Sequence, residues 1–293
     1  MWGCNAVGST SEVWPDDVIE QATSRNLVLV IGAGVSRACV KNAASPPAWD
    51  KLLVGLCDAL SIVGESRVEI DALVSHRRML DAAALIRHEA VQKSRLQDFY
   101  NYIRVAVDGK PGASFDGSAW HDAVVKLEPQ LIVTTNYDKI LERATGNGYS
   151  THEFSSDRVA GDVRRRVPTL LKIHGSVDAI EDIVLTRTDY TRLRLTGAHA
   201  LGVLQALFLT RTALLVGYSL GDPDIQLLFE NVLGGRNEAP AHYMLASDDM
   251  PGYEQDVLQY SYGVTPVKYA AGSYDDALKA LVELADLVQG SKP

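Results

Sequence analysis

Four clusters of small or polar residues, each directly after a short apolar run, are the positions where this sequence could carry chemistry. The apolar runs are rich in β-branched residues, which is typical of strands buried on both faces of a parallel sheet. The carboxyl ends of such strands lie along one edge of the sheet, and ligands bind at that edge. We therefore expect one crevice to be lined by Gly32-Ala33-Gly34, Asn136-Tyr137-Asp138, His174-Gly175-Ser176 and Gly217-Tyr218-Ser219.

Asn136 and His174 carry the side chains best suited to catalysis in these clusters. An asparagine amide offers both a donor and an acceptor, so it can orient a ribose hydroxyl or a water molecule. Histidine is the side chain most often used as a general base. Asp138 could accept hydrogen bonds from a carboxamide N–H₂ group. Structural interpretations stay open, because Asn136 or Asp138 could cap the next helix and a histidine at a strand end is often structural.

Gly32 and Gly34 fall between an expected strand and an expected helix. Glycine there lets the backbone turn tightly and lets a phosphate approach the free N–H groups of the helix N-terminus. The third glycine of the dehydrogenase fingerprint is replaced by Arg37, and its acidic ribose-binding residue could only be Asp50, in a helix-like stretch. Hydride transfer is therefore not expected, and a tight turn without a ligand is the structural alternative.

A second glycine-rich turn runs from Gly217 to Asp222. The hydroxyl of Ser219 in this turn is a candidate contact to a phosphate or a ribose. Asp222 precedes Pro223, and an aspartate before a proline is typical of an N-cap followed by the first residue of a helix. We therefore expect a helix to begin at Pro223.

The elements that position these clusters alternate between strands and helices. Strands are expected at residues 26–31, 131–135, 169–173, 212–216, 242–246 and 263–269, and a last helix at 277–289. Between them, apolar residues recur at helical spacing without an intervening strand at 49–61, 81–90 and 94–107. This order predicts a single α/β domain over residues 1–293, with a Rossmann-like, doubly wound parallel sheet and a helical insertion at about 45–126.

The composition of the chain indicates which partners and which cellular compartment to expect. The net charge of −9 argues against a general nucleic-acid surface, and the run from Arg164 to Arg166 is interpreted as a solvated face. The cysteines, Cys4, Cys39 and Cys57, form no C-x-x-C pair, so neither a zinc site nor a disulfide framework is expected. Residues 1–20 lack the features of a signal peptide, and no apolar run is long enough to cross a bilayer. We expect a cytoplasmic protein without a metal.

The ordered set of clusters resembles the motifs of the sirtuin family. Residues 32–36 resemble the sirtuin G-A-G-[IV]-S motif, and Asn136-Tyr137-Asp138 resembles the Asn-x-Asp of Q-N-I-D. His174-Gly175 is similar to the sirtuin catalytic histidine and the glycine after it, and residues 217–220 are similar to the cofactor-contacting G-[TS]-S-L stretch. Order and strand-end placement agree across most of residues 26–270.

Residues 134–138, 172–176 and 217–223 also resemble T-T-N-Y-D, K-x-H-G-S and G-Y-S-x-x-D-P, the motifs of sirtuin-like domains in bacterial anti-phage defence, Thoeris-type systems included. That resemblance implies cleavage of NAD, as substrate, to nicotinamide and ADP-ribose. For that reaction, our hypothesis is that Asn136 holds the ribose and the incoming water and that His174 acts as base. The resemblance also implies that NAD is bound by Gly32, Ala33, Gly34, Ser36, Thr135, Asp138, Gly217 and Ser219, with Asp138 on the nicotinamide carboxamide.

Two departures from the deacylating sirtuins weaken the case for an acyl-lysine channel. The zinc module with two C-x-x-C pairs is missing from the sequence, and Pro46-Pro47-Ala48-Trp49 stands roughly where Asp-Phe-Arg is expected. A protein deacylase or ADP-ribosyltransferase, and a nucleotide-sensing subunit without catalysis, are the alternative functions. The resemblance further implies control by homo-oligomer assembly or by an activating partner, such as a translocase or a phage sensor. From the charge and the apolar run lengths given above, we expect no membrane and no direct nucleic-acid binding.

Overall fold

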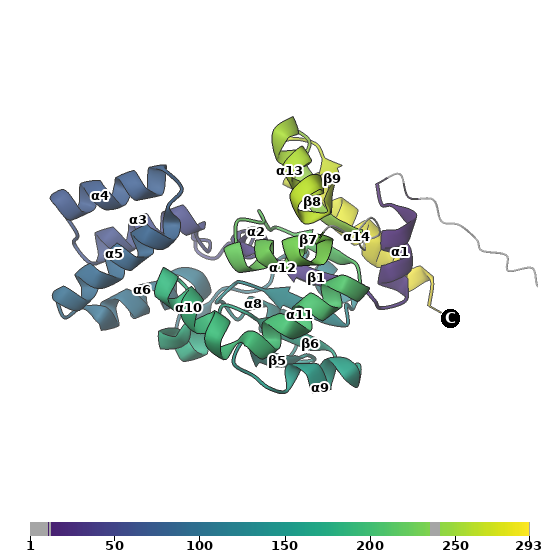
Figure 1. Ribbon diagram of the computed structural model, residues 1–293, viewed down its shortest axis with the longest axis horizontal. Coiled ribbons are helices and arrows are strands. Elements are labelled where there is room, and N and C mark those ends of the chain that lie inside the picture. Colours follow the sequence, from purple (N-terminus) through teal and green to yellow (C-terminus); the bar gives the residue numbers. More distant parts are fainter. Residues whose placement is uncertain (1–10, 12, 235–240, 293) are drawn as a thin grey trace, which may run out of the picture.

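The computed structural model describes residue 11, residues 13–234 and residues 241–292. Residues 1–10 lie outside the described residues. They include Cys4 and half of the segment in which no signal peptide was expected. Figure 1 shows a twisted sheet with helices on both faces and a separate group of helices to one side.

Seven parallel strands form the sheet, in the order β5-β6-β4-β1-β7-β8-β9. Their bounds are β1 Val28–Ile31, β4 Leu131–Thr134, β5 Ser150–Glu153, β6 Thr169–Lys172, β7 Ala213–Val216, β8 His242–Ser247 and β9 Val264–Tyr269. The predicted Rossmann-like, doubly wound parallel sheet is therefore confirmed. All the strands predicted from the sequence are present, and β5 is an additional one.

The edge strand β5 was not predicted because it lacks the apolar signal of a buried strand. Its four residues include Ser150, Thr151 and Glu153, and only His152 is buried. It pairs with β6 alone, so one of its edges has no neighbouring strand among the described residues. Polar residues are tolerated at such an edge because the strand is covered on fewer sides.

The order of the strands changes direction at β1. This strand pairs with β4 on one side and β7 on the other, with Ile31 opposite both Thr134 and Val216. On the far side of β4, Thr134 lies opposite Lys172. The strands therefore end at the same level, and the residues that follow them emerge together at the switch point where open α/β sheets bind ligands.

Two helical layers cover the sheet, and the residues of β1 alternate between them. Leu29 and Ile31 pack into the core beneath α1 (Asp16–Thr23), α7 (Ala119–Leu127) and α14 (Tyr274–Gly290). Val28 and Val30 pack on the opposite face, beneath α9 (Val159–Arg164), α11 (Ala198–Thr210), α12 (Pro223–Leu233) and α13 (Gly252–Tyr262). Successive side chains of a strand point to opposite faces, so a strand between two helical layers must be apolar throughout.

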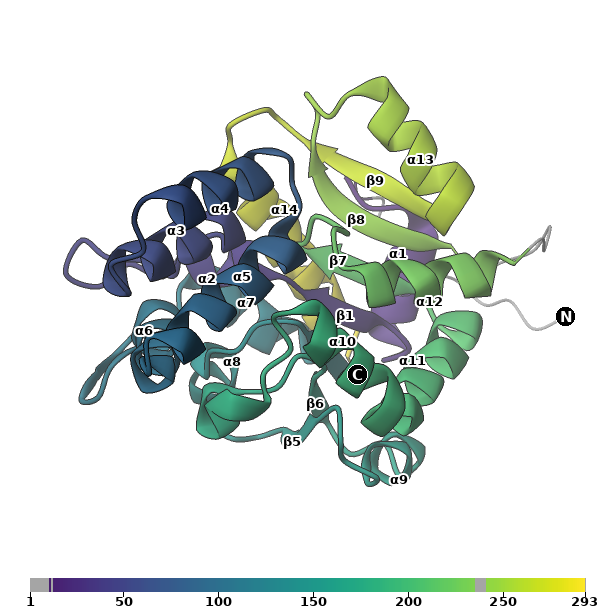
Figure 2. The ribbon, with the colours of Figure 1, turned by 60° about the vertical axis from the view of Figure 1, so that its left-hand side comes forward.

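A third core lies within the group of helices beside the sheet (Figures 1 and 2). The group consists of α3 (Trp49–Ala59), α4 (Glu65–Ser75), α5 (Met79–Gln92) and α6 (Leu96–Asp108), and is called here the helical lobe. Val177 and Ile180, from the short 3₁₀ helix η1 (Val177–Asp182), pack into its core. Helix α4 was not predicted from the sequence. Ile70 is its only fully buried residue, so the helix has no stripe of apolar residues at helical spacing.

Smaller elements complete the chain. After the helical lobe comes a short antiparallel pair, β2 (Gly109–Lys110) and β3 (Ala113–Ser114). Short helices α2 (Ala33–Arg37) and α8 (Ile140–Ala144) follow β1 and β4, and α10 (Arg187–Thr196) precedes α11. In the part of the chain that the structure describes, no single helix is long and apolar enough to cross a membrane, although α10 and α11 meet that test as a pair bent by 79°.

Candidate functional site

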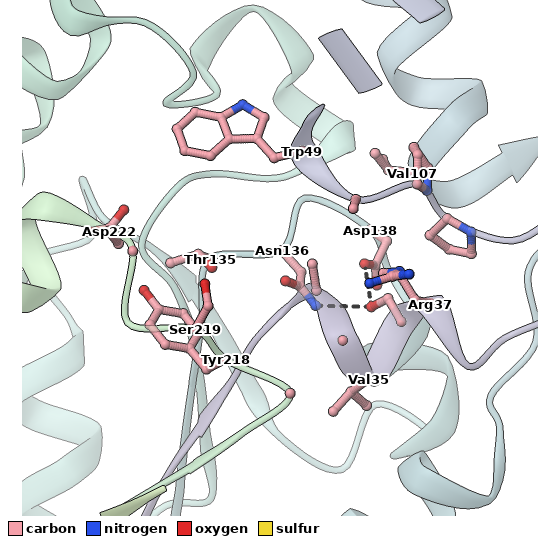
Figure 3. A pocket seen from close by; sticks show the side chains of 18 of the residues that line it. Val35, Arg37, Trp49, Val107, Thr135, Asn136, Asp138, Tyr218, Ser219 and Asp222 are labelled. Atoms are coloured by element: carbon pink, nitrogen blue, oxygen red, sulfur yellow. Dashed lines mark hydrogen bonds between the residues drawn. The ribbon is translucent and has the colours of Figure 1, made fainter. Parts of the chain in front are cut away.

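A cavity of about 470 Å³ opens at the carboxyl edge of the sheet (Figure 3). Of the ten residues that the sequence singled out, nine line it: Ala33, Gly34, Ser36, Thr135, Asn136, Asp138, His174, Gly217 and Ser219. Gly32 is buried behind the wall, where its carbonyl accepts a hydrogen bond from Asn136. The clusters after β1, β4, β6 and β7 therefore meet at one place, as the parallel topology requires.

Asn136 is held so that its amide protons point into the protein. Its Nδ2 donates to the carbonyl of Gly32 at 3.1 Å and to Oγ of Ser36 at 2.9 Å. Its backbone N–H donates to the hydroxyl of Thr134 at 3.0 Å. In Figure 3 the amide oxygen faces the side of the cavity where Thr135 and Tyr218 lie. Asn136 therefore presents an acceptor, which suits it to bind a hydroxyl group or a water molecule.

Asp138 lies deeper, and both of its carboxylate oxygens already accept hydrogen bonds. Oδ2 accepts from the hydroxyl of Ser36 at 2.8 Å, and Oδ1 accepts from the backbone N–H of Ile140 at 3.0 Å, in the first turn of α8. Burial raises the pKa of Asp138, although the ammonium of Lys172 opposes that shift. Asp138 thus supports the start of α8 and ties the loop after β4 to the loop after β1.

His174 is buried between two tyrosines and one aspartate. The ring packs edge-to-face on Tyr190, with centroids 5.3 Å apart, and stacks on Tyr137 at 6.5 Å. Its Nε2 lies 2.9 Å from Oδ2 of Asp222, without the alignment of a linear hydrogen bond. Tyr190 donates to the same Oδ2 at 2.5 Å. The histidine therefore faces a carboxylate on its buried side.

Asp222 also begins α12, as its position before Pro223 predicted. Its Oδ1 accepts from the backbone N–H groups of Asp224 at 3.0 Å and Ile225 at 2.9 Å. Burial by itself would raise the pKa of Asp222, but the charge of His174 and the hydrogen bond from Tyr190 outweigh it, and the pKa falls to about 2. The expectation of an N-cap is confirmed, while the contact with His174 was not foreseen.

The glycines are required chiefly because two loops approach each other closely. A Cβ on Gly32 would lie 2.3 Å from the carbonyl oxygen of Gly217, and one on Gly34 would lie 2.8 Å from the Cα of Gly217. The N–H of Gly34 donates to that carbonyl at 2.9 Å. Gly217 itself has φ of +60°, which favours glycine. The tight packing of the loops after β1 and β7 accounts for all three glycines, and contact with a phosphate stays a prediction.

Several residues that line the cavity were not predicted from the sequence. Trp49 and Val107 line the cavity from the helical lobe, and Val107 lies on the same side as Arg37 (Figure 3). Among the described residues that line the cavity, Arg37 is the only arginine or lysine. Trp120, Leu245, Tyr269 and Tyr274 also line the cavity. The sequence analysis looked for polar clusters directly after apolar strands. These residues do not belong to such clusters, so the sequence pattern did not indicate them.

Hydroxyl groups line the middle of the cavity. Thr135 is half-buried and Ser219 is exposed, and both lie beside Tyr218 (Figure 3). In the described part of the chain, no group of three or more His, Cys, Asp or Glu side chains is placed to hold a metal ion. The polar groups that the cavity presents, an amide oxygen, an imidazole and hydroxyl groups, suit a polar organic ligand.

Residues 130–267 match the family described as SIR2-like domain. This segment, somewhat less than half of the chain, is similar to a SIR2-like domain. The matched segment extends from β4 to β9, so it contains Asn136, His174 and the loop after β7. Gly34 and the rest of the loop after β1 precede the matched segment, yet they complete the same cavity. The resemblance to the sirtuins drawn from the sequence motifs is therefore confirmed.

Several curated proteins are similar to this chain. NAD(+) hydrolase ThsA of Acinetobacter baumannii (strain 532279) is 21% identical over 220 residues, which cover 74% of this chain and 41% of the relative. Defense-associated sirtuin 2 of Bacillus subtilis is 26% identical over 218 residues, or 72% of this chain and 20% of the relative. NAD(+) hydrolase ThsA of Bacillus cereus (strain MSX-D12) is 25% identical over 147 residues, which cover 49% of this chain and 31% of the relative. The matched segments thus cover only 20–41% of the length of these relatives.

Proposed function

We propose that this chain hydrolyses NAD to nicotinamide and ADP-ribose and that it acts as an effector of anti-phage defence. The observation that carries the proposal is the convergence of Asn136 and His174 on one cavity at the switch point of a SIR2-like domain. Relatives named NAD(+) hydrolase and defence-associated sirtuin support the choice of substrate and of biological setting. The cavity of about 470 Å³ is of the size that holds a small-molecule ligand.

The reaction breaks the bond between C1′ of the ribose and the ring nitrogen of nicotinamide. The bonding electrons pass to that nitrogen, which loses its positive charge, so nicotinamide leaves as a neutral molecule and needs no general acid. The oxygen of a water molecule bonds to C1′, and the proton of that water passes to a base. Catalysis then depends on positioning the ribose and the water and on supplying that base.

Asn136 and His174 supply these two functions in the proposal. The amide oxygen of Asn136 accepts a hydrogen bond from a ribose hydroxyl or from the attacking water, because its amide protons are already used within the protein. His174 takes the proton as general base. A positioned base of this kind contributes about 10²–10⁴ in rate.

The remaining predicted residues are proposed to bind the rest of NAD. Asp138 binds the nicotinamide carboxamide, since each carboxylate oxygen can accept a further hydrogen bond beyond those from Ser36 and Ile140. The phosphates and riboses contact Gly32, Ala33, Gly34, Ser36, Thr135, Gly217 and Ser219. No metal takes part in this scheme.

The first experiment measures nicotinamide release from NAD by the purified chain and by the Asn136→Ala and His174→Ala variants. Asn101→Ala and His199→Ala are the matched controls, because Asn101 and His199 are exposed on α6 and α11, away from the cavity. Each site variant is expected to lose about 10²-fold or more of the rate while staying folded, and the controls to keep it. Near-wild-type release by folded His174→Ala would contradict the proposal.

The same preparations separate the alternative functions. Formation of O-acetyl-ADP-ribose from an acetylated peptide would identify a protein deacylase. Binding of NAD without its consumption would identify a nucleotide-sensing subunit or an enzyme that waits for an activator.

Control of the activity is proposed to come from assembly. We propose a homo-oligomer that responds to an activating partner, such as a translocase or a phage sensor, and light scattering on the purified chain tests the first part. A strict monomer would contradict it. We also propose that residues 1–293 are one domain, in which the helical lobe is an insertion that lines the cavity through Trp49.

A further inference from the structure

We propose that Asp222 and Tyr190 are positioning residues that hold His174 in one orientation and one tautomer, so that it can act as the base. This inference rests on the proposed function, because it concerns the same histidine. It assigns a task to a carboxylate and a phenol that neither the sequence motifs nor the helix-capping role of Asp222 explains.

The carboxylate of Asp222 is fixed from three directions. Its Oδ1 is held by the N–H groups of Asp224 and Ile225 at the start of α12. Its Oδ2 accepts a hydrogen bond from the hydroxyl of Tyr190, which belongs to α10. The remaining direction of Oδ2 leads to Nε2 of His174 at 2.9 Å. A capping role would need only Oδ1, so the contacts of Oδ2 require another explanation.

Tyr190 is itself held firmly in place. The residue before it, Asp189, caps the first turn of α10 together with Thr186, and it accepts two hydrogen bonds from Arg87 of α5 at 2.8 and 3.0 Å. Tyr190 packs against Leu193 in a small buried cluster. The first turn of α10 is thus tied to the helical lobe, and the phenol can define the position of the Asp222 carboxylate.

A buried carboxylate at this distance determines which ring nitrogen carries the proton. Asp222 and His174 are 8% and 5% exposed, so their mutual attraction is weakly screened by water. An ionised carboxylate beside Nε2 favours the tautomer with the proton on Nε2, and Nδ1 then carries the lone pair. When Nδ1 takes the proton from the attacking water, the imidazolium that forms is stabilised by the same carboxylate.

The ring N–H of His174 is not yet aligned on Oδ2. Catalytic contacts are often poorly aligned in a protein without its substrate, and they tighten when the substrate binds. Nε2 already lies 2.9 Å from Oδ2, so a small rotation of the ring on substrate binding would align its N–H with the carboxylate. For the orientation of His174 during the reaction, the rigid support of Asp222 by α10 and α12 therefore matters more than the hydrogen-bond alignment in the protein without substrate.

The decisive variant is Asp222→Asn, because asparagine caps a helix about as well as aspartate but carries no charge. In this variant an N–H₂ group replaces Oδ2 beside His174, and it favours the opposite tautomer. We expect kcat for nicotinamide release to fall about 10²–10⁴-fold with KM for NAD changed less than about twofold. Tyr190→Phe removes one hydrogen bond and keeps the charge, so kcat should fall about 10-fold.

The control for charge and helix position is Asp224→Asn. Asp224 lies in the same first turn of α12 and is also buried, but it pairs with Arg194 at 2.7 Å. It is not among the residues that line the cavity in the described part of the chain. We expect this variant to keep the wild-type kcat, since only the carboxylate beside His174 is proposed to act on the ring.

A second readout needs no substrate, so it separates this inference from the proposed function. Nitrogen-15 NMR of the His174 ring at neutral pH reports which nitrogen carries the proton. We expect Nε2–H in the wild type and in Asp224→Asn, and a shift toward Nδ1–H in Asp222→Asn, with Tyr190→Phe between them. An unchanged ring signal in folded Asp222→Asn, or an equal loss of kcat in Asp224→Asn, would overturn the proposal. If Asp222→Asn does not fold, the ring signal of Tyr190→Phe decides, and a wild-type signal there overturns it.

Discussion

The ammonium of Lys172 lies 3.0 Å from Oε1 of Glu142, and both side chains are buried where β6 meets α8. The same ammonium donates to the backbone carbonyl of Asp138. Lys172 is only 1% exposed, so its charge depends on these two partners. A buried charge without partners is costly, and the pair therefore ties the loop that carries Asn136 and Asp138 to the strand that leads to His174.

Replacing Lys172 with Met should destabilise the protein strongly. The change leaves the carboxylate of Glu142 buried without its partner, and breaking a buried ion pair in this way costs about 3–5 kcal/mol. Urea unfolding measures the change in the free energy of unfolding. The double variant Lys172→Met with Glu142→Leu should recover much of the loss, because no charge remains buried. A loss below about 1 kcal/mol in the single variant would contradict this view of the pair.

Gly34→Ala should destabilise the protein by about 1–3 kcal/mol, because the new methyl group would meet the backbone of Gly217 at 2.8 Å. Gly202→Ala is the matched control, since a Cβ at that exposed position of α11 meets nothing within 4 Å. The control should instead stabilise the helix by about 0.5–1 kcal/mol. Thermal unfolding of the two variants beside the wild type gives the comparison, and equal melting temperatures would show that the two loops can move apart freely.

Arg37→Gln should raise the KM for NAD about 10-fold with little change in kcat. Arg37 is the only arginine or lysine among the described lining residues, and it makes no ion pair with the rest of that described chain. The diphosphate of NAD is an anion that this side chain can bind, and a charge-assisted hydrogen bond accounts for an effect of that size. The KM of the wild type should also rise with salt, and that of the variant should respond less.

The matched control for this change is Arg164→Gln, which removes an exposed arginine on α9. Its KM and its response to salt should equal those of the wild type. If both variants raise KM equally, the effect comes from net charge, and Arg37 has no direct contact with NAD.

Two buried histidines should make the protein less stable as the pH falls from about 6.5 to about 4. Burial lowers the pKa of both His121 and His242 from 6.5 to about 4, because the charged form loses its hydration. His242 lies against Phe208 and Phe229, and its Nδ1 accepts from the N–H of Ala213 at 3.1 Å. With the folded pKa below the unfolded one, the stabilisation is complete above pH 6.5 and is lost as the pH falls through 4.

Each of these histidines can contribute on the order of 3 kcal/mol to that loss, from a shift of about 2.5 pKa units. Urea unfolding at a series of pH values measures it. His242→Gln should flatten the dependence between pH 6.5 and 4, whatever its effect at pH 7. His199→Gln, at an exposed position on α11, should leave the dependence unchanged. If the free energy of unfolding of His242→Gln falls as steeply with pH as that of the wild type, His242 does not contribute to the loss of stability.

The sequence by itself determined the sheet and the place of the candidate site. Strands such as Val28–Ile31 and Leu131–Thr134 are apolar throughout, because each is buried on both faces, and this signal is local. The polar residues directly after them had to meet, since parallel strands end at one edge of the sheet. Short motifs around Asn136 and His174 were sufficient to indicate the sirtuin-like family.

Only the tertiary structure decided how the side chains of the site are held. Ser36 and Asp138 are 102 residues apart in the chain, and Tyr190 and Asp222 are 32 apart, so no local pattern records these contacts. The sequence showed Asp222 as a helix cap, because capping involves residues two or three positions away, whereas its partner His174 lies on another strand end. Local signals describe what a residue does to its own element, and packing between distant elements decides which groups meet.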